Sequence, residues 1–226
     1  MHILRSAQRK AGWWRTQSQS NQSQHRNSLR YDSHPPRNKF RSLVLSCDPA
    51  GKANIKNDHT AITVLGIDKR ELYLLQVSRG HWTVLEMRDR IKALASQWEA
   101  THVIVEDTAS GMGLIQILRE QTRLSVIGRH PKDDKETRLS RHQGRFEAGR
   151  IFLPAEAPWL ADFESELLAF PNSRYDDQVD ALLLFLDWIS ANEYDDSCHS
   201  LCHLSLVDLG MFQGPRFLRS KFIEGL

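Results

Sequence analysis

Acidic residues stand at three places where an apolar segment of the chain begins or ends. Asp48 ends the segment VLSCD, Glu106 lies at the end of VIVED, and Asp177 and Asp180 stand at the start of DDQVDALLLFLDWI. Residues i and i+3 share one face of a helix, so these two aspartates would point the same way. Four converging carboxylates repel one another unless cations lie between them. All four acids are therefore candidate metal ligands and catalytic residues.

Phosphodiester hydrolysis is the chemistry that such a set of carboxylates could support. Hard oxygen ligands suit Mg²⁺ or Mn²⁺. Two such ions, about 3.5–4 Å apart, can activate a water molecule and stabilise the leaving oxygen. A single acid has a plainer explanation, because Asp and Glu often cap helix N-termini, and Asp177 could be only such a cap. The metal-site hypothesis therefore depends on the whole set.

The segments that carry these acids predict a layered α/β fold. Strands are expected over five apolar segments, namely 41–50, 60–67, 71–78, 101–108 and 124–130. Helices are expected over 82–99, 110–121 (with Ser110 as N-cap), 132–149, 159–168 and 176–190. This order favours a mixed sheet, with an antiparallel three-strand meander plus parallel strands and helices on both faces.

Composition and charge divide the chain of 226 residues into a central domain and two flanking segments. Up to Ser42 there are nine basic residues and one acidic residue, a net charge of +8, which leaves −6 for the remainder. We expect a basic, disordered arm over 1–41, one globular domain over 42–192 and a tail of unknown structure over 193–226. The arm could be only a solvated tail, or it could contact a polyanion.

The remaining composition indicates an intracellular protein. The three cysteines form no disulfide framework. No apolar run reaches the roughly 18 residues of a membrane-spanning helix, and the N-terminus lacks the apolar block of a signal peptide. We therefore expect a cytoplasmic location with no membrane partner.

The ordered motifs resemble the nuclease domain of phage terminase large subunits. They are SCDPAGKANIKNDHTA, VIVEDTASGMGLIQILRE, FEAGRIFLP and FPNSRYDDQVDALLLFLDW, within about residues 42–190. The resemblance implies an RNase H-like fold, related to Holliday-junction resolvases, that cuts double-stranded DNA with two Mg²⁺ or Mn²⁺ ions during genome packaging. It makes Asp48 the first-strand ligand, Glu106 the central ligand and Asp177 with Asp180 the closing pair. Asp180 matches the resolvase pattern, and Asp177 matches many terminases.

The resemblance also implies partners and a source, but one motif of the terminase family, the ATP-binding motif of its motor, is missing from this sequence. A small terminase subunit, a portal or a separate ATPase motor are the implied partners, in a bacterial host cell with a phage or prophage gene. No G-x-x-x-x-G-K-[ST] motif occurs, and Gly51-Lys52-Ala53 lacks both the upstream glycine and the Ser or Thr. We therefore expect no ATP hydrolysis by that route. A fragmentary prophage gene is an open alternative.

A row of basic residues is the candidate DNA contact. Lys132, Lys135, Arg138 and Arg141 recur every three residues and should lie near one helix face. Terminases have a similar basic helix at this position, which favours phosphate binding over a merely solvated face. The turn lysine Lys52 is a further candidate. Asp187, two turns beyond Asp180, is expected to be solvated.

Two other functions remain open. One is a structure-selective, resolvase-like nuclease, which would prefer four-way junctions to long duplexes. The other is a non-catalytic DNA-docking or portal-docking remnant of a prophage terminase, which would bind DNA but not cut it with any metal.

Overall fold

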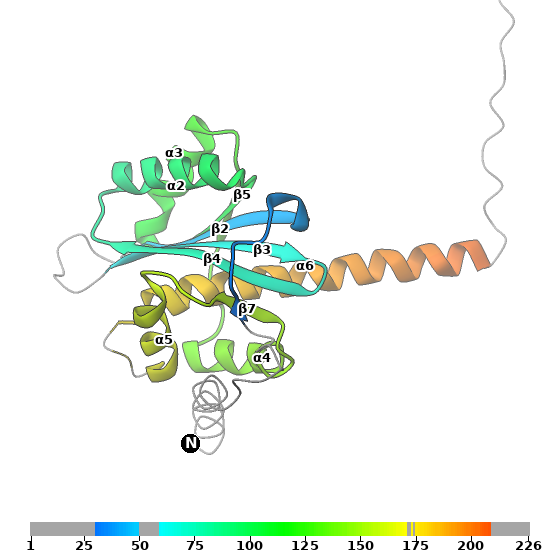
Figure 1. Cartoon of the computed structure of the whole chain (residues 1–226). Coiled ribbons are helices and arrows are strands. Elements are labelled where there is room, and N and C mark those ends of the chain that lie inside the picture. The colour runs from blue at the N-terminus through cyan, green and yellow to red at the C-terminus, as the bar shows by residue number, and fades with distance from the viewer. Residues whose placement is uncertain (1–29, 50–58, 171–172, 174, 209–226) are drawn as a thin grey trace, which may run out of the picture. The chain divides into compact units, whose positions relative to one another are not determined.

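The computed structural model describes residues 30–49, 59–170, 173 and 175–208 (Figure 1). Its elements are β1 (Arg30–Tyr31), η1 (Arg37–Lys39), β2 (Ser42–Asp48), β3 (Thr60–Asp68), β4 (Glu71–Gly80), α2 (Val84–Trp98), β5 (His102–Glu106), α3 (Ala109–Gln121), β6 (Ser125–Arg129), α4 (Lys135–Glu147), β7 (Ile151–Pro154), α5 (Leu160–Ala169) and α6 (Asp177–Asp208). By its contacts the chain divides into a unit of residues 1–188 and a unit of residues 189–226. The described part of the second unit, 189–208, is helical.

The first unit is built on a mixed sheet of seven strands in the order β1-β7-β4-β3-β2-β5-β6. Strands β2, β3 and β4 form an antiparallel meander. Strands β5 and β6 continue the sheet from β2 in parallel, and β7 pairs in parallel with β4. The predicted meander plus parallel strands is confirmed, and β7 adds a strand that was not expected.

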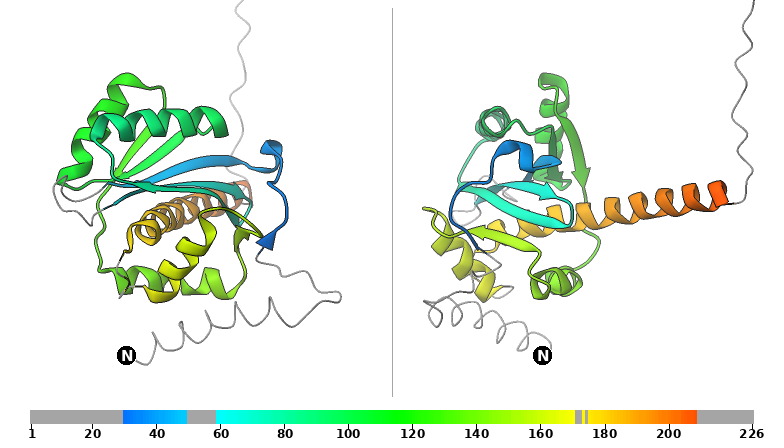
Figure 2. Two further views of the ribbon diagram at one scale, coloured as in Figure 1. Left: turned by 60° about the vertical axis from the view of Figure 1, so that its left-hand side comes forward. Right: turned by 45° about the vertical axis from the view of Figure 1, so that its right-hand side comes forward.

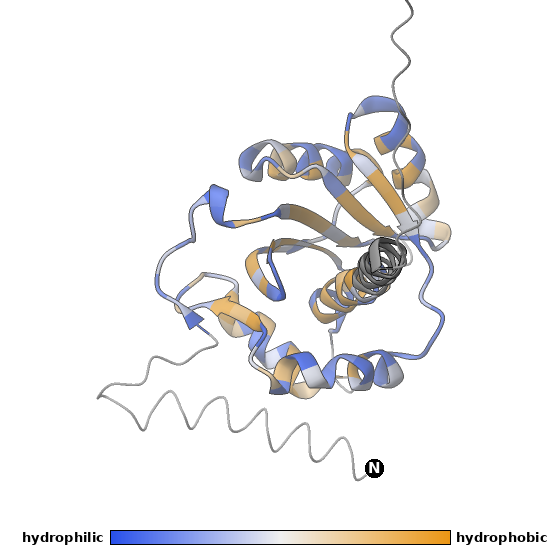
Figure 3. Cartoon of the chain, turned by 90° about the vertical axis from the view of Figure 1, so that its right-hand side faces the viewer, coloured by the Kyte–Doolittle hydropathy of each residue, from blue (hydrophilic) through white to orange (hydrophobic). Residues whose placement is uncertain are grey.

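Helices cover both faces of this sheet, with α2 and α3 on one face and α5 with the first part of α6 on the other (Figures 1 and 2). Burial on both sides requires nearly continuous apolar strands, and every residue from Leu43 to Cys47 in β2 is buried. In α6 every residue from Gln178 to Asp187 is buried as well. Figure 3 shows apolar residues concentrated on the central strands and on this part of α6.

A local signal determines where α2 begins, whereas α3 begins without one. The Thr83 side chain accepts from the Glu86 backbone, and the Glu86 carboxylate accepts from the Thr83 backbone, so a capping box starts α2. The predicted Ser110 cap of α3 is wrong, because the N-cap is Thr108, without a side-chain cap hydrogen bond. The Ser110 hydroxyl instead lies 3.4 Å from the Pro49 carbonyl, which ties the start of α3 to the residue after β2.

The structure differs in two places from the expected flanking segments. Within the expected arm, β1 pairs with β7, and Phe40 belongs to the hydrophobic core, so residues 30–41 contribute to the fold. Residues 1–29 and 209–226 lie outside the described residues. In the expected tail, residues 193–208 continue α6. Among the described helices, none has the length and apolar character needed to cross a membrane.

Candidate active site

Asp48 and Glu106 lie side by side at one edge of the sheet. Strands β2 and β5 are parallel neighbours, and Cys47 is aligned with Val105, so each strand ends in its acid at the same level. The two carboxyl groups lie close enough to influence each other electrostatically, because burial and then the Glu106 charge raise the pKa of Asp48 well above its usual value. The sequence-predicted pair therefore comes together in space.

A glycine behind Glu106 allows the close packing of this edge. A Cβ atom at Gly111, in the first turn of α3, would lie 1.9 Å from the Glu106 carbonyl oxygen. No side chain can occupy that space without moving the end of β5. Gly111 was not recognised in the sequence, although a glycine in the first helical turn after an acid was a usable signal.

Asp177 and Asp180 approach the same edge from the start of α6. Asp177 Oδ2 is buried and makes no hydrogen bond within the described part of the chain, and His59 Nδ1 lies 4.0 Å from it. Asp180 is bound by cations: Lys135 Nζ lies 2.5 Å from Oδ2 and Arg138 Nη1 lies 3.3 Å from Oδ1. One aspartate of the pair thus has an unsatisfied oxygen, and the other is already neutralised.

The pKa shifts show that these acids share one electrostatic environment. Burial is the largest cause of the raised pKa of Asp48, followed by the charges of Glu106, Asp180 and Asp177. The pKa of Glu106 is raised by burial and then by the Asp180 charge. Burial and then the charges of Glu166 and Asp176 raise the pKa of Asp177 to about 7. The site holds more carboxylates than nearby cations can balance.

The donor atoms at this edge suit a hard divalent cation, although the described side chains do not surround one in this arrangement. Asp48, Glu106 and the unsatisfied Asp177 oxygen offer the oxygen ligands that Mg²⁺ and Mn²⁺ prefer. Over the described ranges, no group of three or more His, Cys, Asp or Glu side chains could hold an ion directly. Lys135 and Arg138 pair with the two oxygens of Asp180.

The basic face of α4 is turned largely toward α6. Arg138 is buried, with 3% of its surface exposed. Lys135 is half-buried and pairs with Asp176 and Asp180. Arg141 is exposed but pairs with Asp133 and Asp187, and Lys132 is exposed. Lys135, Arg138 and Arg141 lie in α4, whereas Lys132 precedes this helix, so the four residues do not form the expected row on one helix face. The buried Arg138 is not available to DNA in this arrangement. The other candidate, Lys52, lies outside the described residues.

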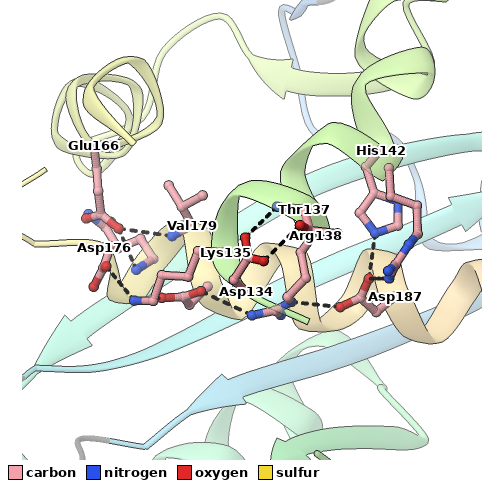
Figure 4. Close-up of polar contacts among 12 residues, drawn as sticks. Asp134, Lys135, Thr137, Arg138, His142, Glu166, Asp176, Val179 and Asp187 are labelled. Carbon is pink, nitrogen blue, oxygen red and sulfur yellow. Dashed lines mark hydrogen bonds and ion pairs between the residues drawn. The ribbon is translucent and has the colours of Figure 1, made fainter. Parts of the chain in front are cut away.

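Asp187 is the centre of these contacts, and the expectation that it is solvated is wrong. It is buried and accepts hydrogen bonds from Arg138 Nε at 2.9 Å, Arg141 Nη1 at 3.3 Å and His142 Nε2 at 2.8 Å (Figure 4). Burial alone would raise the pKa of Asp187, but the hydrogen bonds from His142 and Arg138 outweigh burial and lower it. This carboxylate joins α4 to α6.

Glu166 of α5 holds the start of α6 and was missed in the sequence. Its buried carboxylate accepts from the backbone N–H groups of Gln178 at 2.7 Å and Val179 at 3.0 Å, and from Gln178 Nε2 at 2.7 Å (Figure 4). Arg79 Nη1 lies 3.4 Å away. The first N–H groups of a helix have no partner within it, so Glu166 supplies a cap from a neighbouring helix. The spacing of three from buried Phe163 could have indicated that it points inward.

The family of terminase RNaseH-like domains matches residues 45–187, so the chain belongs to that family. Among solved structures, it is similar to the large terminase of a thermophilic bacteriophage, with a TM-score of 0.55 and 15% identity over 72% of this chain and 43% of that one. The large terminase nuclease of a thermophilic phage named G20c, with bound zinc, gives 0.52 and 20% over 70% and 92%. The human cytomegalovirus terminase nuclease domain gives 0.52 and 15% over 69% and 88%.

At these identities the structural likeness demonstrates the fold, which is that of an RNase H-like terminase nuclease domain. The chain spans less than half the length of the first of these three proteins, 43% of it. No curated protein matches the sequence.

Proposed function

We propose that this protein is a metal-dependent endonuclease that cuts double-stranded DNA, as in phage genome packaging. The observation that carries the proposal is the meeting of Asp48 and Glu106 at the ends of neighbouring parallel strands, within electrostatic reach of Asp177 and Asp180. Membership of the terminase RNaseH-like family supports the same reaction. Solved relatives with this fold are named as terminase nucleases.

In the proposed mechanism Asp48, Glu106 and Asp177 would hold two divalent ions, Mg²⁺ or Mn²⁺, and Asp180 would complete the set. Bound ions would supply an activated water molecule and stabilisation of the leaving oxygen. The remaining chemistry belongs to the chain itself. Asp48 and Asp177 must lose any bound proton to act as ligands, and Lys135 must release Asp180 if that residue is to bind an ion. Glu166 keeps the start of α6 in position throughout.

The wider assembly is also a proposal. Residues 42–192 would carry the nuclease, with β1 and Phe40 completing its fold, while 1–41 supply a basic arm and 193–226 a tail. The exposed Lys132, Lys135, the exposed Arg141 and Lys52 would contact DNA phosphates. A separate ATPase motor, a small terminase subunit and a portal would be partners in the host cytoplasm. The suggestion of a separate ATPase motor rests on the length comparison: this chain matches only 43% of the thermophilic bacteriophage large terminase.

Nicking of supercoiled plasmid tests the proposed function. We expect the wild-type protein to cut with Mn²⁺ or Mg²⁺ and not in EDTA, and Asp48→Asn or Glu106→Gln to abolish cutting while the circular dichroism spectrum is unchanged. Each variant removes one negative charge from a crowded site, so folding should be retained. Nicking that continues unchanged in either variant would show that another site or a contaminant is responsible.

A second substrate distinguishes the alternatives. A terminase-type nuclease should cut long duplex DNA at least as well as a four-way junction, whereas a resolvase-like enzyme should prefer the junction. A docking remnant should bind duplex DNA and cut neither substrate with any metal. Duplex cutting that depends on Asp48 would exclude this last alternative.

A further inference from the structure

A row of aromatic rings borders the candidate carboxylate site on the side of β3 and β4. His59 precedes β3, His81 follows β4, and Tyr175 precedes α6. The rings of His59 and His81 lie with centroids 4.0 Å apart and an interplanar angle of 34°. The Tyr175 ring meets His59 edge-on, with centroids 5.0 Å apart. Three separate parts of the chain thus contribute rings to one continuous row.

The row starts at the candidate metal ligands and reaches solvent. In the sheet, Asp48 pairs with Ala61, and the adjacent Thr60 pairs with Gly80, so His59 and His81 lie at the same edge as Asp48. His59 Nδ1 is 4.0 Å from Asp177 Oδ2. His81, at the other end of the row, is exposed. A strand whose phosphate occupied the carboxylate site would pass close to this exposed ring.

The inner part of the row is held by a cation from β4. The Arg79 guanidinium lies over the Tyr175 ring, 5.3 Å from its centroid. The same side chain reaches Glu166, which caps α6. Just beyond His81, Arg90 lies over the Trp82 ring at 4.4 Å. Cations and aromatic rings that lie next to one another are the groups with which proteins bind single nucleic-acid strands.

We propose that the exposed ring of His81 stacks against an unpaired base of the DNA strand next to the cleaved phosphate, with His59 and Tyr175 supporting it from behind. This inference rests on the proposed nuclease function and deepens it by naming the substrate class, DNA with locally unpaired nucleotides at the cut. Intact duplex offers its base faces only to neighbouring bases, so it would not use this contact. Base–aromatic stacking is strong enough to change affinity by roughly tenfold.

The test compares the affinities of the full-length protein for a gapped duplex and an intact duplex of the same sequence, measured by fluorescence anisotropy in EDTA. We expect the wild-type protein to bind the gapped duplex roughly tenfold more tightly. His81→Ala should remove this preference, and His81→Phe should keep it because an aromatic face remains. The matched control is His102→Ala, at the opposite end of β5 from Glu106, which should leave the preference unchanged.

Equal affinities for the two duplexes in the wild-type protein, or a preference that survives His81→Ala, would overturn the inference. Loss of the preference in His81→Phe as well would also overturn it, because a role of the imidazole other than stacking would then be responsible. The measurement involves no cutting, so its result is separate from that of the plasmid assay. A protein that shows the preference but never nicks plasmid would refute the nuclease proposal and retain the base contact.

Discussion

Helix α6 carries two buried or half-buried aspartates whose surroundings are opposite. Asp187 receives hydrogen bonds from two arginines and a histidine, and its pKa is lowered. Asp177, ten residues earlier, has a buried oxygen without a hydrogen bond in the described part of the chain, and its pKa is raised to about 7. One residue type on one helix therefore meets two different electrostatic conditions.

The difference separates a structural carboxylate from a candidate functional one. A buried charge is tolerated when fixed partners of opposite charge surround it, and removing one partner then leaves the others uncompensated. A group of carboxylates that lacks such partners either takes up protons or binds cations from solution. We infer that Asp187 holds α4 against α6, whereas Asp48, Glu106 and Asp177 form the candidate cation-binding site.

The largest expected effect is on folding, from Asp187→Asn. The change removes the closer of the two carboxylate partners of buried Arg138 and leaves only Asp180, so the free energy of unfolding should fall by roughly 3–5 kcal/mol. Asp48→Asn, measured alongside in EDTA, should cost nothing or stabilise the protein, because it relieves repulsion. Urea unfolding followed by circular dichroism compares the two. A larger loss in Asp48→Asn than in Asp187→Asn would reverse the assignment.

Next in size is the effect of the cap on α6. Glu166→Gln keeps one oxygen but introduces an amide donor opposite the N–H groups of Gln178 and the Arg79 side chain. Affinity for Mn²⁺ should fall by roughly 10–100-fold, as for other residues that orient metal ligands. Calorimetric titration measures this, and Glu164→Gln on the same helix, which pairs with Arg30, is the control. Equal affinity in both variants would show that Glu166 only supports the fold.

A smaller effect should appear in the pH dependence of the metal-free protein. The folded pKa of Asp177, about 7, lies above its ordinary value of 3.8. The folded state therefore binds the proton more tightly, and the stability that this gives is present at low pH and is lost as pH rises from about 4 to about 7. Melting temperatures in EDTA should fall across this range, by less in Asp177→Asn. Added Mn²⁺ should oppose the fall, and a rise with pH attributable to Asp177 would contradict the assignment.

The smallest effect is expected at Lys132, which precedes α4. Lys132→Ala removes a cation that lies in solvent, so DNA affinity should drop only a few-fold and equally for all sequences. The slope of log affinity against log salt should become shallower by about 0.9 if the contact with phosphate is lost. Anisotropy titrations at several salt concentrations measure the slope. An unchanged slope would mean that Lys132 does not touch the backbone.

The sheet and the meeting of Asp48 with Glu106 could be predicted because both depend on patterns within short segments. Each acid ends an apolar strand, and neighbouring parallel strands end at one edge. The direction in which α4 faces could not be predicted, since a spacing of three shows which residues share a face but not what that face meets. Arg138 was thus expected at a DNA surface and is buried against Asp187.

Two positioning residues were harder to find because their roles depend on contacts between distant elements. The caps that sequence reveals are local, whereas Glu166 caps a helix that begins eleven residues later, across an intervening loop. Gly111 matters only because the Glu106 carbonyl happens to lie where its side chain would be. The contribution of Phe40 to the core was hidden by the polar composition of the segment around it.

The candidate site combines residues from β2, β5 and the start of α6, so it cannot form until all three segments have been synthesised. A ribosome that has released the chain only as far as α5 has delivered Asp48 and Glu106 but not Asp177. Domains fold as units during synthesis, and contacts between distant segments form late. For the nuclease proposed above, the nascent chain would therefore be inert toward nucleic acids until nearly the whole domain had left the ribosome.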